Sequence, residues 1–156
     1  MIRSEALDSL WGELGDAQQV EQALRHELDH LDASEISLRA EVLSQIALAL
    51  AVQRRFDDAH RTLDLADSQS WELTPIARVR ILLERGRVVQ QEGDLAKARE
   101  WFEKAFAISA QNRLDFHTIN IAHMIAIVEP GKSREPCGCS GETTRRWDDS
   151  NRSETN

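Results

Sequence analysis

The sequence contains one pattern typical of metal chemistry, His26-Glu27-Leu28-Asp29-His30, which matches H-E-x-x-H. On a helix, His26 and His30 would share a face and could hold Zn²⁺, with Glu27 as the general base of a hydrolase. Such a site needs a third protein ligand, and no second motif follows to supply it. The surrounding segment is rich in Glu, Asp and Gln, which is typical of a solvated helix face. We therefore expect no metal and no cofactor, and zinc-dependent hydrolysis stays an alternative.

Other catalytic patterns are weaker. Cys137 and Cys139 form C-x-C and supply at most two thiolates, whereas a structural zinc site usually takes four ligands. The glycines are isolated rather than gathered in a phosphate-binding loop, and no Ser-His-Asp or Cys-His arrangement is visible. The sequence therefore predicts a protein that is not an enzyme.

A cluster of arginines, Arg78, Arg80, Arg85 and Arg87, indicates binding. The formal net charge of −8 argues against nucleic acid as the partner, since phosphate binding needs a cationic surface. Arg80, Arg87 and Gln91 are spaced to share one helix face, where guanidinium groups could hold a peptide carboxylate. The alternative is a polar surface in which Arg78 and Arg85 pair with acids of neighbouring helices, for about 0–1 kcal/mol each.

The elements that would position these residues are helices. Pro is absent from residues 1–74 and 76–129, and apolar residues recur with helical spacing, as in residues 43–50. Thr74 before Pro75 is a helix-start signal, and no segment alternates as a strand would. The 156 residues should therefore form one all-α domain. The expected helices span residues 4–12, 17–31, 35–53, 56–68, 75–92, 95–110 and 114–128.

Two segments correspond at a fixed offset of 39 residues. Large apolar residues fall on large ones and small residues on small ones, as expected where stacked helices cross closely. The corresponding pairs are Leu43 and Leu82, Ala47 and Gly86, Leu50 and Val89, Phe56 and Leu95, Ala59 and Ala98, Leu63 and Phe102, and Ala66 and Ala105. This correspondence indicates a helical repeat.

The repeat resembles the tetratricopeptide repeat, which has a small residue in its first helix, a large apolar residue opening the second, and then two alanines seven residues apart. Residues 35–128 resemble two full repeats plus the first helix of a third, with Ala122 in the small position. Residues 1–34 resemble degenerate capping helices. The resemblance implies a right-handed α-solenoid of antiparallel helix pairs over residues 1–129. A generic helical bundle is the alternative, because it has the same periodicity.

The resemblance also implies a function. In such arrays the first helices line a concave groove that binds a protein or a peptide. The residues expected in this groove are Glu41, Ser44, Leu48, Arg80, Arg87, Gln91 and His123. We therefore expect a non-catalytic scaffold whose preformed groove recognises its partner.

Residues 130–156 depart from the repeat, since their only apolar side chains are Cys137, Cys139 and Trp147. Such a segment cannot offset its ordering entropy, so we expect a disordered tail. Helix 114–128 would then expose an apolar face. In one hypothesis the reading is truncated or frame-shifted after Pro130. In the other the exposed face binds another chain, and the protein could be a structural fragment that self-associates.

The sequence gives no sign of a membrane or secretory protein. Residues 1–11 contain acids, and no apolar run follows them. The longest uncharged runs, residues 42–53 and 116–128, fall short of the ~20 residues that span a bilayer. We expect a cytoplasmic protein with no membrane partner.

Overall fold

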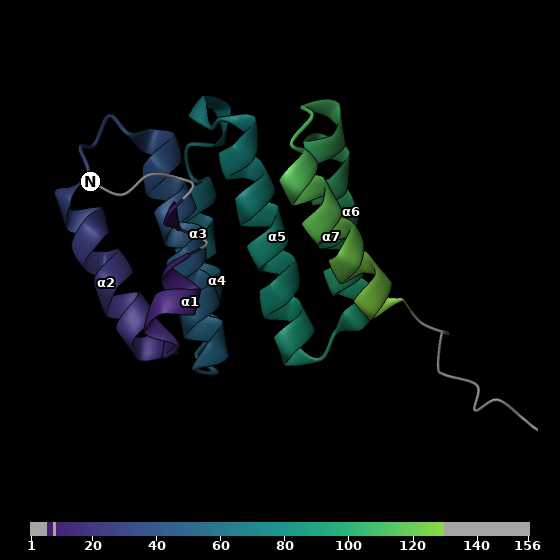
Figure 1. Cartoon of the computed structure of the whole chain (residues 1–156), viewed down its shortest axis with the longest axis horizontal. Helices are drawn as coiled ribbons and strands as arrows, with labels where there is room; N and C mark the ends of the chain where they lie inside the picture. Colours follow the sequence, from purple (N-terminus) through teal and green to yellow (C-terminus); the bar gives the residue numbers. More distant parts are fainter. Residues whose placement is uncertain (1–5, 8, 130–156) are drawn as a thin grey trace, which may run out of the picture.

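A computed structural model describes residues 6, 7 and 9–129 of the chain. It is helical throughout this part, with no strand in the described ranges, so the all-α prediction is confirmed. The elements in chain order are α1 (Leu10–Leu14), α2 (Ala17–His30), α3 (Ile36–Val52), α4 (Phe56–Asp67), the 3-10 turn η2 (Ser70–Glu72), α5 (Pro75–Glu92), α6 (Leu95–Gln111) and α7 (Asp115–Val128) (Figure 1). The predicted disordered tail, residues 130–156, lies outside the described residues.

The predicted helix bounds are correct to within one residue from α2 to α7. The prediction for the first helix, residues 4–12, is wrong at its end, and residues 1–5 lie outside the described part. Gly12 lies inside α1, and the helix ends at Leu14, directly before the capping residue Gly15, whose φ of 65° is left-handed. Glycine adopts this conformation without steric cost, and it commonly follows the last turn of a helix.

Local side-chain bonds explain where two of the helices begin. Thr74 Oγ1 accepts a hydrogen bond from the Ala77 amide at 3.4 Å, and Pro75 opens α5 as predicted. Asp94 Oδ1 accepts from the Lys97 amide at 3.0 Å at the start of α6. Both bonds satisfy amides that have no partner inside the helix.

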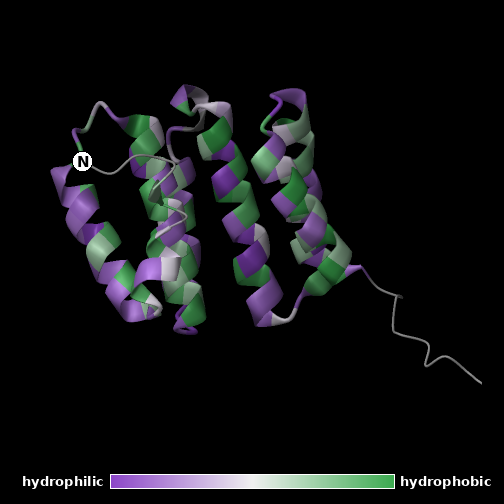
Figure 2. Cartoon of the chain, viewed as in Figure 1, coloured by the Kyte–Doolittle hydropathy of each residue, from purple (hydrophilic) through white to green (hydrophobic). Residues whose placement is uncertain are grey.

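Helices α2 to α7 stand side by side, joined by short connections (Figure 1). The central helices are α3, which contacts α2, α4 and α5, and α5, which contacts α3, α4, α6 and α7. Figure 2 shows apolar residues interleaved with polar ones along α2 and α5, as expected for helices that bury part of their surface. None of the described helices is long and apolar enough to cross a membrane.

Two apolar clusters fill the space between the helices. One joins α2, α3 and α4 to one side of α5 and includes Leu24, Ile46 and Leu63. The other joins the opposite side of α5 to α6 and α7 and includes Phe102 and Ile121. The small residues that correspond between the two sequence segments are all buried, namely Ala47, Ala59, Ala66, Gly86, Ala98 and Ala105. Leu95 departs from the pattern, because it lies half exposed at the start of α6.

Gly86 marks the closest approach of α5 to α6. A Cβ atom at this position would overlap Cε1 of Phe102, whose ring is completely buried. The ring has no room to move away, because protein interiors are close-packed. The absence of a side chain at Gly86 is therefore a requirement of packing.

Replacing Gly86 by alanine is expected to lower the free energy of unfolding by about 1–3 kcal/mol, because the added methyl group overpacks the interface. This loss opposes the helix propensity of alanine, which favours it over glycine by ~1 kcal/mol. Urea unfolding measures the difference. Gly12→Ala is the matched control, since a Cβ there meets no atom within 4 Å. Equal stability of the two variants would contradict the packing argument.

Candidate functional site

A cavity of about 260 Å³ lies between α3, α5 and α7, with α1 contributing to its wall. The lining residues are Trp11, Gln45, Leu48, Arg80, Leu83, Glu84, Arg87, Phe116, His117 and Asn120. The charged members, Arg80, Glu84 and Arg87, all come from α5, where spacings of four and three residues place them on one face. Polar groups from several helices thus converge on one hollow, as in many binding sites.

A buried ion pair lies beside this cavity. Arg80 Nε of α5 is 3.1 Å from Glu41 Oε2 of α3, and each side chain is only 4% exposed. The two residues are 39 positions apart, so they occupy corresponding positions in the two repeated segments. Each charge is tolerated in the interior because the other is present.

A second polar contact also joins corresponding positions of the two repeated segments. Gln45 Nε2 of α3 donates to Glu84 Oε1 of α5 at 3.2 Å, again across 39 positions. Trp11 Nε1 of α1 donates to Gln45 Oε1 at 3.1 Å, and Arg87 Nη1 donates to Glu84 Oε1 at 3.1 Å. A chain of hydrogen bonds therefore crosses α1, α3 and α5 along the cavity wall.

Glu84 is an unusual carboxyl group, because it is 1% exposed. Burial raises its pKa above the ordinary value, against the opposing effects of the Arg87 charge, the Gln45 hydrogen bond and the Arg80 charge. Within the described part of the chain, Glu84 Oε2 is buried without a hydrogen-bond partner. This oxygen can accept a hydrogen bond when the group is ionised and can carry a donor proton when it is neutral.

The raised pKa of Glu84 predicts a pH-dependent stability. The unfolded chain loses this proton near the ordinary pKa of 4.5 and the folded chain loses it at higher pH, so unfolding is favoured increasingly as pH rises between the two values. Relative to wild type, Glu84→Gln should therefore gain stability as pH rises through this window. Urea unfolding across the window measures the change. Glu100→Gln, at an exposed position of α6, is the control, and a pH-independent difference for Glu84→Gln would contradict the assignment.

The residues that the sequence predicts in the groove do not all line the cavity. Leu48, Arg80 and Arg87 line the cavity. Glu41 and Ser44 are buried beside it, where Ser44 Oγ donates to the backbone oxygen of Glu41 at 2.7 Å. Arg80 and Glu41 therefore form an ion pair with each other between α3 and α5.

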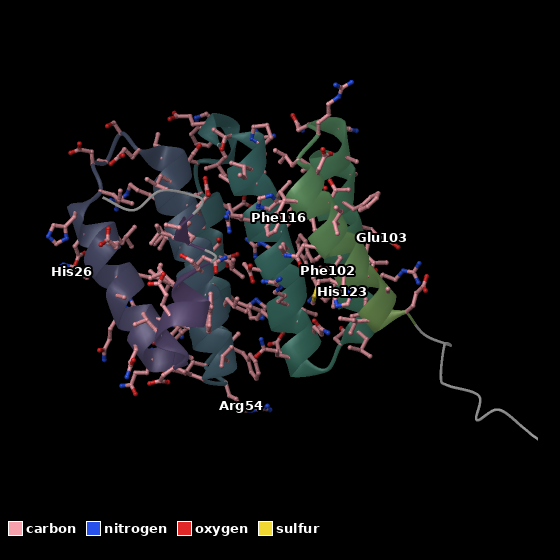
Figure 3. All side chains as sticks on the ribbon, viewed as in Figure 1. His26, Arg54, Phe102, Glu103, Phe116 and His123 are labelled. Atoms are coloured by element: carbon pink, nitrogen blue, oxygen red, sulfur yellow. The ribbon has the colours of Figure 1, made fainter. Side chains whose placement is uncertain are left out.

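Gln91 and His123 are exposed and lie outside the cavity wall. On α7 the wall is formed instead by Phe116, His117 and Asn120; Figure 3 labels both Phe116 and His123 on this helix. Helical periodicity identifies residues that share a face but leaves the rotation of the helix open. The sequence did contain a signal for the contact between Gln45 and Glu84, since these two residues have the same offset of 39 as Glu41 and Arg80.

The other arginines of the α5 cluster serve different contacts. Arg85 Nη2 lies 3.0 Å from Asp64 Oδ1 of α4, as expected for pairing between neighbouring helices. The Arg85 guanidinium also lies over the ring of Trp101 in α6, at 5.5 Å from its centre. Arg78 is exposed and borders a separate hollow. These two arginines therefore do not contribute to the cavity.

The H-E-x-x-H histidines share a face of α2, with ring centres 4.4 Å apart. Figure 3 shows His26 at the outer edge of the molecule, and His30 Nδ1 lies 2.7 Å from the backbone oxygen of His26. Over the described ranges, no three His, Cys, Asp or Glu side chains are grouped to hold a metal ion. Cys137 and Cys139 lie outside these ranges. The zinc interpretation thus rests on the sequence motif alone.

Comparison of the chain with protein-family models, with curated proteins and with solved structures found no match.

Proposed function

We propose that the protein is a non-catalytic scaffold that binds a peptide segment of a partner protein in the groove between α3, α5 and α7. We further propose that α3–α4 and α5–α6 are tetratricopeptide-like repeats of a right-handed solenoid, that α7 is the first helix of a third repeat, and that α1 and α2 are degenerate capping helices. The observation that carries the proposal is the cavity, whose polar wall is assembled from several of these helices.

The cavity wall has the chemistry to orient a peptide. Arg87 donates one hydrogen bond to Glu84, and a guanidinium has five donors, so others are available to a carboxylate or a backbone carbonyl of the partner. Trp11, Leu48 and Phe116 supply apolar surface for a side chain of the peptide.

The buried ion pair supports a preformed groove. Arg80 is held by Glu41, and Glu84 is held by Gln45 and Arg87, before any partner arrives. A site whose side chains are already ordered loses less conformational entropy on binding. The groove is therefore suited to binding an extended segment without rearrangement of these side chains.

A peptide-display selection against the purified protein tests this function. We expect enrichment of sequences with an acidic side chain or a free carboxyl terminus, and Arg87→Ala should weaken the enriched peptides about tenfold or more, as measured by calorimetry. Arg78→Ala, outside the cavity, is the control. Arg80 is a poor choice for this experiment, since its loss would disturb the core. The proposal fails if no sequence family is enriched or if Arg87→Ala leaves affinity unchanged.

A further inference from the structure

The charges around the cavity between α3, α5 and α7 are balanced before any ligand enters. Arg80 pairs with Glu41 at 3.1 Å, and Arg87 pairs with Glu84 at 3.1 Å. Among the described residues that line the cavity, the groups that can carry a charge are Arg80, Glu84 and Arg87 of α5 and His117 of α7. With His117 neutral and both pairs ionised, the charges of the two arginines and the two glutamates cancel.

A ligand carboxylate bound at Arg87 would disturb this balance. It would contact the guanidinium group that already holds Glu84, so two carboxylates would share one cation. The described residues that α1 and α3 contribute to the wall are Trp11, Gln45 and Leu48, and none of them carries a charge. When two carboxylates share a site, the pKa of one of them rises strongly and it takes up a proton. Binding of a carboxylate in this cavity therefore requires a proton.

Glu84 is the group best placed to receive this proton. Its side chain is 2% exposed, so water does little to stabilise its charged form. Oε1 accepts hydrogen bonds from Gln45 and Arg87, whereas Oε2 has no hydrogen-bond partner in the described part of the chain. Burial already raises the pKa of Glu84. Glu41 is less suitable, because it does not line the cavity and its Oε2 contacts Arg80.

We propose that the groove binds a carboxylate together with one proton, which Glu84 holds on Oε2 and donates as a hydrogen bond to the ligand. This inference rests on the proposed function, since it concerns the ligand of the same groove. The proton comes from solvent, and with it the charges around the occupied cavity again cancel. A hydrogen bond from a neutral carboxyl group to a carboxylate is charge-assisted and therefore strong. The affinity of the groove for an acidic segment is thus controlled by pH through Glu84.

The peptide acetyl-Leu-Glu-Leu-amide is a suitable probe, because it carries one carboxylate between apolar side chains. Calorimetry of the full chain with this peptide, in buffers of different ionisation enthalpy, counts the protons taken up on binding. Over the pH range in which the peptide stays ionised, we expect an uptake approaching one proton. The affinity should fall about tenfold for each pH unit above the pKa of free Glu84. The matched control peptide, acetyl-Leu-Gln-Leu-amide, should cause no proton uptake.

The variant Glu84→Gln separates this residue from the other titratable groups. Its amide is a neutral donor at every pH, so its affinity for the acidic peptide should no longer change with pH and no proton should be taken up. Glu100→Gln, at an exposed position of α6, should keep the proton uptake of the wild type. Uptake that persists in Glu84→Gln would assign the proton to another group, such as His117, and would overturn the inference.

Two further outcomes count against the inference. Binding of the acidic peptide without proton uptake would overturn it and leave the proposed function standing. The absence of saturable binding to a chain shown by circular dichroism to be folded would overturn it as well. The peptide-display selection, which samples peptides of any charge, then decides separately whether the groove binds peptides.

Discussion

Arg80→Met is expected to lower the free energy of unfolding by about 3–5 kcal/mol, because it leaves the Glu41 carboxylate buried without its cation. The two groups are 3.1 Å apart and nearly excluded from water, so solvent cannot replace the missing partner. Arg80 also helps to hold the charge of Glu84. Urea unfolding near neutral pH measures the loss.

The double variant Glu41→Met/Arg80→Met separates the ion pair from general packing. Removing both charges avoids the uncompensated carboxylate, and replacing a buried pair by apolar residues is often neutral or stabilising. We therefore expect the double variant to recover most of the stability lost in Arg80→Met. Arg78→Met, at an exposed position of the same helix, is the control. If the double variant is as unstable as Arg80→Met, the loss comes from packing and the electrostatic explanation is wrong.

Phe102→Ala is expected to cost about 3–5 kcal/mol, the range for removing a buried aromatic ring. Phe102 is completely buried in the cluster that joins α5, α6 and α7, and it is the largest fully buried side chain among the described residues. The residue opposite it is Gly86, which has no side chain to fill the space that the ring leaves. The cavity should therefore persist, and the cost should lie toward the upper end of the range.

Phe106→Ala provides the comparison for this variant. Phe106 lies one turn later on α6 and is partly exposed, so its removal should cost about 1 kcal/mol or less. Both variants are measured by denaturant unfolding with the wild type. Similar losses for Phe102→Ala and Phe106→Ala would show that the close contact at Gly86 is not a centre of stability.

The ion pair and the aromatic contact also explain why the cavity between α3, α5 and α7 has a defined shape. Phe102 sets how closely α6 approaches α5, while Arg80 and Glu41 hold α5 against α3. A variant that disturbs either contact would change binding indirectly. The Arg87 variant is a better probe of function, since this side chain reaches solvent.

The sequence by itself determined the helices, because their signals are local. Apolar spacing, the Thr74-Pro75 start and the Asp94–Lys97 bond depend on residues within one turn, so the predicted bounds from α2 onward are correct to within one residue. The offset of 39 also identified small residues that the fold buries, among them Ala47 and Gly86. The prediction of helix bounds was wrong at the first helix, a short element that is followed by a left-handed glycine.

The tertiary structure alone decided which charges are buried and which face of α7 is open. The spacing of Arg80 and Arg87 is the same on a solvated face and in an interior, and only the approach of α3 makes Arg80 part of a buried pair. The rotation of α7 follows from the packing of Ile121 and Val128, so Phe116 lies at the cavity and His123 does not. Periodicity specifies neighbours along one helix, whereas burial depends on the distance between helices that are far apart in sequence.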